Sequence, residues 1–461
     1  MCSPRNEVRR VRRGFWGPIA GCAEAEDWAR SGAMRYTPID KELFRLNRAN
    51  LKKLLPPHSL AVVNANDVLP SNGDAVLPLQ QNSDFFYLTG IEQEESLLLL
   101  YPDAHEPKHR EILFLRQPNP LLETWEGHKL TQEEAKGISG AEEVQWLTEF
   151  PALFHRLMCE GSQVYFNSNE HKRAHVVVES RDARFIRETR ERYPLHDYRR
   201  LAPLMHRLRA VKSEVEIALL RKACALTEDG FRRVCRLVKP GVNEMEVEAE
   251  FAHEFLRRGG RFAYNPIIAS GLNACALHYL QNDQVCRKGD LLLMDVGASY
   301  ANYNADMTRT IPVGGRFTRR QKQVYNAVLR VMRAVSQAAT PGKLSRDLQT
   351  EADQFVEKEL VDLGLLTMAE IKKQDPDNKA FRKYFMHGVG HPLGLDVHDL
   401  TLTVEPIQAG WVLTVEPGIY LKEEGFGVRL ENDILVREGG NVDLMETIPV
   451  EAEEVEELMR G

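Results

Sequence analysis

The sequence predicts a mixed α/β protein made of two halves. In residues 37–202, short apolar runs bounded by polar or turn residues alternate with helical segments, as in an α/β domain. In residues 213–461, two amphipathic helices precede a group of strand-like runs, and this order then occurs a second time. The chain has 461 residues and 43% hydrophobic residues, which is enough for two or three domains with packed cores.

The amino-terminal half is expected to contain a sheet and no catalytic constellation. A helix is predicted to begin after Thr131, because Glu134 completes a capping box. The histidines of this half are scattered and are interpreted as surface residues: His128, His155, His171 and His175. Short apolar runs predict strands at Ser59–Val63, Phe85–Leu88, Leu97–Tyr101, Ile112–Leu115 and Val164–Phe166.

The carboxyl-terminal half is expected to follow a join at Leu201–Lys212, which Pro203 interrupts. Capping residues predict four helices, which begin at Ser213, near Asn243, at Thr318 and at Ser345. Pro-Gly pairs at 240–241 and 341–342, 101 residues apart, end the first helix of each pair. This recurrence indicates one helix–helix–sheet unit used twice, with the two inner sheet faces meeting each other.

Composition excludes several classes of protein. The net charge is −7 and no long basic run occurs, which argues against a nucleic-acid partner. The seven cysteines are odd in number and form no Cys-x-x-Cys pair, which favours reduced thiols in a cytoplasm. No apolar run approaches the roughly 18 residues of a membrane span. Residues 1–36 are predicted to be a disordered extension, or a consequence of start-site choice with Met34 as the true start; a transit peptide is the alternative.

Candidate metal ligands are concentrated in one stretch of the second half. Side chains at i and i+2 lie on the same face of a strand. In several predicted strands of this stretch, the last residue on an otherwise apolar face is an acid. Four carboxylates and one imidazole suit Mn, Co, Fe or Zn, and so many acids indicate two ions roughly 3.5–4 Å apart. A buried unpaired carboxylate is costly, and metal ions would remove that cost. The five candidates are Asp295, Asp306, His391, Glu416 and Glu431.

The order and spacing of these residues resemble a known family. The motifs are His-Gly-Val-Gly-His at 387–391, Glu-Pro-Gly at 416–418 and Arg-Leu-Glu-Asn-Asp at 429–433, together with Gln-Asn-Ser-Asp-Phe-Phe-Tyr-Leu-Thr-Gly at 81–90. They are similar to those of the pita-bread metallopeptidases, and most similar to aminopeptidase P (Xaa-Pro aminopeptidase). The resemblance covers residues from about 37 to 450 and implies a pseudo-twofold pita-bread fold in the second half.

The resemblance also implies roles for individual residues. Asp306 would bridge two divalent ions, most simply Mn²⁺, with Zn²⁺ or Co²⁺ as alternatives. His391 is preferred to His387 as the ligand, because only His391 stands seven residues before a second histidine, His398, as the family requires. Glu416 would act as the general base for a metal-bridging hydroxide, while His398 and His278 would donate hydrogen bonds to the intermediate and to the substrate carbonyl.

The implied substrates are peptides with proline at the second position, and the implied state is a homo-oligomer, a dimer or a tetramer. His387 and Arg429 would contact the substrate on the proline side, and the alternative for Arg429 is a partner of the metal-binding carboxylates. Two other functions stay open: a prolidase, which cuts free Xaa-Pro dipeptides, and a peptide-binding protein without catalysis. Pro392 and a short 399–415 segment depart from the bacterial pattern, so the preferred first residue and peptide length stay open.

Overall fold

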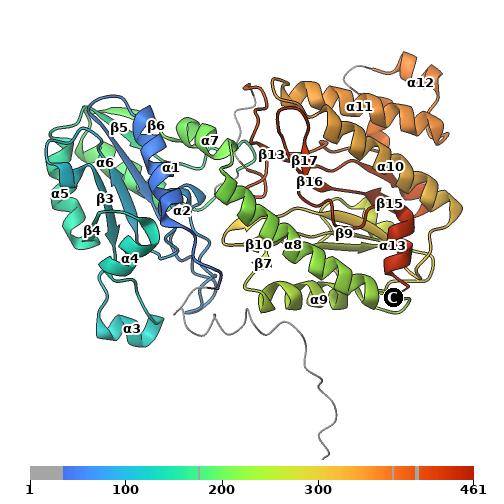
Figure 1. The fold of residues 1–461 in the computed structure, drawn as a ribbon, viewed down its shortest axis with the longest axis horizontal. Coiled ribbons are helices and arrows are strands. Elements are labelled where there is room, and N and C mark those ends of the chain that lie inside the picture. Colours follow the sequence, from blue (N-terminus) through green and yellow to red (C-terminus); the bar gives the residue numbers. More distant parts are fainter. Residues whose placement is uncertain (1–34, 175–176, 376–377, 400–403, 461) are drawn as a thin grey trace, which may run out of the picture.

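The computed structural model describes residues 35–174, 177–375, 378–399 and 404–460. They form two lobes joined through the middle of the chain (Figure 1). Residues 1–34 and His175, for which the sequence made predictions, lie outside the described residues. Tyr36 is described: its side chain is buried and its hydroxyl donates to Glu92 Oε2 at 2.8 Å. Among the described residues, no helix combines the length and the apolar character needed to cross a bilayer.

The first lobe contains one six-stranded sheet in the order β4-β3-β2-β1-β5-β6. Neighbours β1–β2 and β2–β3 are antiparallel, whereas β3–β4, β1–β5 and β5–β6 are parallel. The strands are β1 (Ser59–Asn64), β2 (Leu97–Leu100), β3 (Glu111–Leu115), β4 (Glu143–Trp146), β5 (Gln163–Phe166) and β6 (Asp197–Arg200). The helices are α1 (Lys41–Leu54), α2 (Ser83–Thr89), α3 (Pro120–Glu126), α4 (Gln132–Ser139), α5 (Phe150–Met158) and α6 (Arg181–Arg192).

One predicted strand of this lobe is wrong. Residues 85–88 belong to the helix α2, and every residue from Asp84 to Thr89 in it is buried. The side chain of Asn82 caps the helix by accepting from Phe85 N, and Gly90 ends it with a left-handed backbone at φ 68°. A short apolar run buried on all sides has no periodicity that separates a strand from a helix. The polar strands β4 and β6 were not predicted, because they lack such a run.

The second lobe contains the two predicted helix pairs. They are α8 (Glu214–Leu237) with α9 (Glu244–Arg257), and α10 (Arg319–Ala338) with α11 (Ser345–Asp362). Capping boxes begin α8, α9 and α10 at the predicted residues Ser213, Asn243 and Thr318. Figure 1 shows one pair on each side of the central strands. Two shorter helices, α12 (Met368–Lys373) and α13 (Ala452–Leu458), complete the α-helices of this lobe in the described part of the chain.

The strands between the helix pairs form small antiparallel sheets. Their orders are β11-β10-β7, β12-β9-β8, β13-β16-β17 and β14-β15. The strands from the first copy are β7 (Arg261–Phe262), β8 (Ile267–Ser270), β9 (Leu291–Asp295), β10 (Ala298–Tyr300), β11 (Tyr303–Asn304) and β12 (Thr308–Pro312). Those from the second are β13 (Val412–Val415), β14 (Gly418–Leu421), β15 (Phe426–Arg429), β16 (Asn432–Leu435) and β17 (Val442–Asp443).

A group of mostly buried charges ties the two lobes together, and we call it the interdomain cluster. Arg209, near the end of the connecting helix α7 (Ala202–Ala210), donates to Asp84 of α2 at 2.8 Å. It also donates to Asp396 at 2.7 Å and to Asp399 at 2.6 Å, both in the second lobe. Lys212 Nζ donates to the other oxygen of Asp399 at 2.9 Å. The segment that carries His391 and His398 is therefore fastened to the first lobe.

Candidate metal centre and active site

Residues from both copies of the repeated unit bring the five candidate ligands to one place. Asp295 is the last residue of β9, and Asp306 lies just before β12, which pairs with β9 so that Thr308 stands opposite Asp295. Glu431 lies between β15 and β16, and its backbone N–H donates to Thr308 O at 3.0 Å. This bond joins the second copy to the first and places Glu431 beside the two aspartates.

His391 and Glu416 come from two neighbouring segments of the second copy. The backbone N–H groups of Thr414 and Glu416 donate to the carbonyls of His391 and Val389, each at 2.8 Å. Gly390 lies so close to Thr414 that a β-carbon at position 390 would collide with the Thr414 carbonyl oxygen. This close approach explains the second glycine of the His-Gly-Val-Gly-His motif.

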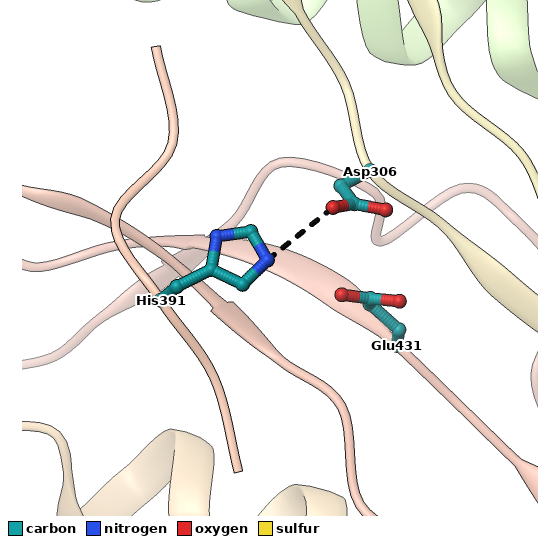
Figure 2. Close-up of side chains that lie close together, drawn as sticks. All are labelled: Asp306, His391 and Glu431. Carbon is teal, nitrogen blue, oxygen red and sulfur yellow. Dashed lines mark ion pairs between the residues drawn. The ribbon is translucent and has the colours of Figure 1, made fainter. Parts of the chain in front are cut away.

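The imidazole of His391 points at the carboxylates (Figure 2). Its Nε2 lies 3.5 Å from Asp306 Oδ2 and 3.8 Å from Glu416 Oε1. Ligand atoms of Asp306, His391 and Glu431 all lie within 4.8 Å of one another, a spacing that suits a shared ion. The alternative ligand, His387, also lies near the centre, with its Nδ1 3.9 Å from Glu416 Oε2. Its Nε2 lies 2.8 Å from the hydroxyl of Tyr420 and its Nδ1 lies 2.7 Å from Gly388 O, so both ring nitrogens have other partners as well.

Hydroxyl groups around the carboxylates were missed in the sequence. Tyr264 lies after β7, and its hydroxyl is 2.6 Å from Asp295 Oδ1 and 2.5 Å from Asp306 Oδ1. Thr308 donates its hydroxyl to Glu431 Oε2 at 2.6 Å. Neither residue belongs to a motif with recognisable spacing, and a single buried tyrosine or threonine is ordinary in a core. No signal in the sequence separated these two from other core residues.

Arg429 is the buried cation of the centre. Its guanidinium donates to Asp295 Oδ2 at 2.5 Å, to Thr308 Oγ1 at 3.1 Å and to the Tyr420 hydroxyl at 3.0 Å. This geometry corresponds to the alternative that the sequence left open for Arg429, a partner of the metal-binding carboxylates. The substrate role of Arg429 stays a prediction.

The carboxylates repel one another in this buried position. Burial is the largest cause that raises the pKa of Glu416 to about 7, and it raises the pKa of Glu431 well above its usual value. The pKa of Asp295 is also raised by burial and by Asp306, although Arg429 opposes the shift. Burial alone would lower the pKa of His391, but its bond to Asp306 and the charge of Glu416 raise it to about 9.

These residues fit divalent metal ions. Asp295, Asp306, Glu416 and Glu431 are four carboxylates that face only the guanidinium of Arg429 and the imidazole of His391, so the buried charge is unbalanced. The phenol of Tyr264 has one proton and lies within 2.6 Å of two carboxylate oxygens, so it satisfies only one of them. Divalent cations would neutralise the remaining charge, and oxygen atoms with one imidazole are ligands that such cations accept.

His398 and His278 lie at the edge of this group. The ring of His398 is 4.1 Å from the ring of His391, measured between centroids. Burial, then His391 and Arg173, lowers the pKa of His398 to about 4. His278 is exposed and follows the short helix η3 (Gly271–Cys275). Burial and the charge of Arg429 are the main causes that lower the pKa of His387 to about 3, and His278 makes a small further contribution.

Two side chains of the first lobe reach His398. Arg173 Nη1 lies 3.1 Å from His398 Nδ1, and the ring of His171 stacks on the His398 ring at 6.5 Å between centroids. His171 is partly exposed, as expected of a surface residue, but the fold brings its loop onto the second lobe, a contact that the sequence did not predict. Position alone could not indicate this contact, which joins residues 225 apart in the chain.

Fold and centre together define a metal-dependent hydrolase, and comparisons with known proteins give its family. Residues 218–438 match the model of metallopeptidase family M24, and residues 44–165 match that of the aminopeptidase P N-terminal domain. The Xaa-Pro aminopeptidase of Haemophilus influenzae is 34% identical over 91% of this chain and 98% of its own length. Human Xaa-Pro aminopeptidase 3 is 32% identical over 86% of this chain and 80% of its own length.

A solved structure agrees with these sequence relatives. Escherichia coli aminopeptidase P with the inhibitor Pro-Leu superposes with a TM-score of 0.81 at 33% identity, over 92% of this chain and 99% of that chain. The chain therefore belongs to the Xaa-Pro aminopeptidase family of M24 metallopeptidases. The pita-bread fold, the family and the class of enzyme that the sequence predicted are confirmed.

Proposed function

We propose that this enzyme releases the first residue from peptides whose second residue is proline, with two divalent ions at the metal centre. The observation that carries the proposal is the convergence of four carboxylates and one imidazole, from segments more than 100 residues apart, in one buried place. The same activity is in the names of relatives that match almost end to end. We assign the ions to Asp295, Asp306, His391, Glu416 and Glu431.

Bound divalent ions would polarise the scissile carbonyl and make water easier to deprotonate near neutral pH. Glu416 accepts the proton of the attacking water and delivers it to the leaving nitrogen. Arg429 and Tyr264 hold Asp295 in place, and Thr308 holds Glu431, through the short bonds described above.

The histidines around the ions have complementary roles in this proposal. His398 and His278 donate hydrogen bonds to the substrate carbonyl and to the tetrahedral intermediate. His387, held by Tyr420, and Arg429 lie on the side where the proline ring would bind. An Xaa-Pro bond has no amide N–H and a fixed φ, so its recognition needs a shaped site and a reachable carbonyl.

Four finer assignments belong to the same proposal. Manganese is the preferred ion, on the resemblance alone, and the working state is a homo-oligomer. The cytoplasm is the proposed location, which the free thiols of Cys159, Cys224, Cys235, Cys275 and Cys286 support. Residues 37–202 and 213–461 are proposed as the two domains, with α7 between them.

The experiment compares three substrates with manganese present: Gly-Pro-Pro, the dipeptide Gly-Pro and Gly-Ala-Pro. We expect kcat/KM to be highest for Gly-Pro-Pro and far lower for the peptide with alanine at the second position. The reason is that residues 399–415 contain no Lys or Arg that would close the exit behind proline. Metal content of the purified protein is measured in the same samples.

Prolidase is the alternative, because Arg173 adds a cation near His398 that the sequence did not place there. A prolidase must bind the free carboxylate that follows proline in its dipeptide substrate. If Gly-Pro is preferred by tenfold or more, about 1.4 kcal/mol in the transition state, the prolidase function replaces ours. A protein without stoichiometric metal and without metal-stimulated hydrolysis would exclude both enzymes.

A further inference from the structure

A turn of the first lobe is built against His398. It follows β5 and carries His171 and Arg173. The turn is held by local hydrogen bonds, since Ala174 N donates to His171 O at 2.8 Å and Arg173 N donates to the side-chain Nδ1 of His171 at 3.2 Å. It is anchored to β6 by an ion pair, in which Arg200 Nε donates to Glu170 at 2.9 Å. The position of Arg173 is therefore set by the fold of the first lobe.

The direction of the hydrogen bond between Arg173 and His398 determines which ring nitrogen of His398 carries the proton. A guanidinium has only donors and stays charged, so Arg173 Nη1 donates and His398 Nδ1 accepts at 3.1 Å. A neutral imidazole carries one N–H, which must then be on Nε2. Nε2 lies across the ring from Nδ1, so this N–H is directed away from Arg173.

The backbone beside His398 is already held, so the ring is the part left to orient. Asp399, the next residue, accepts from Arg209 at 2.6 Å and from Lys212 at 2.9 Å. The ring itself contacts His391 on one side and the turn of His171 and Arg173 on another. Of the charged side chains described here, Arg173 is the one whose hydrogen bond selects between the two ring nitrogens of His398.

We propose that Arg173 is a positioning residue, which holds His398 as the Nε2–H tautomer so that the imidazole can donate a hydrogen bond during peptide hydrolysis. The inference rests on the proposed function only in assigning that donation to His398. The first lobe then supplies part of the reaction machinery within one chain. In addition, a side chain that can only accept at position 173 would place the proton on the wrong nitrogen.

The first test is kinetic, with variants that differ in hydrogen-bond polarity. Arg173→Ala should lower kcat for Gly-Pro-Pro about 10- to 100-fold, the range seen for side chains that orient groups at metal centres, with KM and metal content nearly unchanged. Arg173→Lys, which can only donate, should recover most of the loss. Arg173→Glu, which can only accept, should lose more than Arg173→Ala. Lys172→Ala is the matched control, an exposed cation on the same turn, and should behave as wild type.

A double-mutant cycle separates positioning from a direct contact with substrate. If Arg173 acts through His398, then Arg173→Ala should have no further effect in a His398→Ala background. An equal loss in both backgrounds means that the guanidinium acts on the substrate itself, and the proposal is then wrong. Wild-type kcat in Arg173→Ala, or equal activities in the Lys and Glu variants, also overturns it.

A spectroscopic readout keeps this inference separate from the identity of the substrate. In protein with nitrogen-15 labelled histidine, His398 should show an unprotonated Nδ1 and a protonated Nε2, with His398→Ala identifying the signals. In Arg173→Glu the two signals should exchange character. A wild-type protein with the proton on Nδ1 refutes the inference whichever peptide the enzyme cuts, whereas the substrate comparison tests only the proposed function.

Discussion

Residues 391–399 contribute to two groups of charged side chains, the interdomain cluster and the metal centre. The two groups differ in how well their negative charges are paired with positive ones. The interdomain cluster has two cations, Arg209 and Lys212, against Asp84, Asp396 and Asp399, and each cation makes short bonds to carboxylates. Burial tends to lower the pKa of Arg209, but the three aspartates raise it well above its usual value.

The metal centre is unbalanced, because its four carboxylates face one arginine and one histidine, and the pKa values of Asp295, Glu416 and Glu431 are raised. A cluster in which every carboxylate is bonded by a cation serves structure and needs no ligand. A buried cluster with excess charge of one sign indicates a site that a bound cation completes. Mutation of the metal centre should therefore lower activity, whereas mutation of the interdomain cluster should lower stability.

The largest expected effect comes from removing one acid of the metal centre. Asp306→Asn should lower kcat/KM by more than about 100-fold, with loss of one or both ions. Mutation of side chains that only orient metal ligands costs up to about 100-fold, and loss of a ligand should cost more. The metal-free variant should still fold, because the loss of the ion pair with His391 is offset by the removal of one of four carboxylates that repel one another. Full activity at wild-type metal content would refute the bridging role of Asp306.

The same kind of change in the balanced cluster should act on stability instead. Arg209→Met leaves Asp84, Asp396 and Asp399 with too few partners, and breaking a buried pair costs about 3–5 kcal/mol of unfolding free energy. Urea unfolding of metal-free protein measures this loss without interference from metal binding. A variant as stable as wild type would show that the lobes do not depend on this cluster.

A smaller effect is expected at Gly390, since its segment contributes to both clusters. Gly390→Ala would force its new β-carbon against the carbonyl oxygen of Thr414. Overpacking of this kind costs about 1–3 kcal/mol and should displace His391, so metal affinity falls along with stability. Gly388→Ala is the control, because position 388 has room for a β-carbon. Equal metal affinities in the two variants would contradict this explanation of the motif.

The last prediction concerns pH and metal removal. Glu416 has a folded pKa of about 7 against a usual value near 4.5, so the stability it contributes when protonated is lost as pH rises between these values. His391, raised to about 9 from 6.5, loses its contribution as pH rises further. Chelated protein should therefore lose thermal stability from about pH 5 to 9, and manganese should restore more of it at higher pH. A constant difference between loaded and chelated protein across this range would contradict the assignment.

Local signals in the sequence predicted much of the fold. Capping boxes at Ser213, Asn243 and Thr318 lie where the helices begin, since a cap depends on residues only three apart. The run at 85–88 was placed in a strand, because its burial on every side removed the periodicity that identifies a helix. The roles of the five candidate ligands stay predictions, although the structure brings their side chains together.

Contacts between distant parts of the chain were not predictable in the same way. Arg209 and Arg173 carry no local pattern that names Asp399 or His398 as partners, which lie 190 and 225 residues away. Tyr264 is one tyrosine among 13, and only the fold places its hydroxyl between two aspartates. The resemblance to a family indicated its motif residues, but it gave no information on side chains outside the motifs.

The bond between Glu431 N and Thr308 O, which joins the two copies of the repeated unit, has a consequence for how the enzyme is made. Asp295 and its partner Arg429 are 134 residues apart, so neither copy alone contains the metal centre. Contacts of this sequence separation are slow to form, because a long loop must close before they contribute. A nascent or partly folded chain therefore lacks the centre, and peptide hydrolysis begins only when both halves of the second lobe have closed on each other.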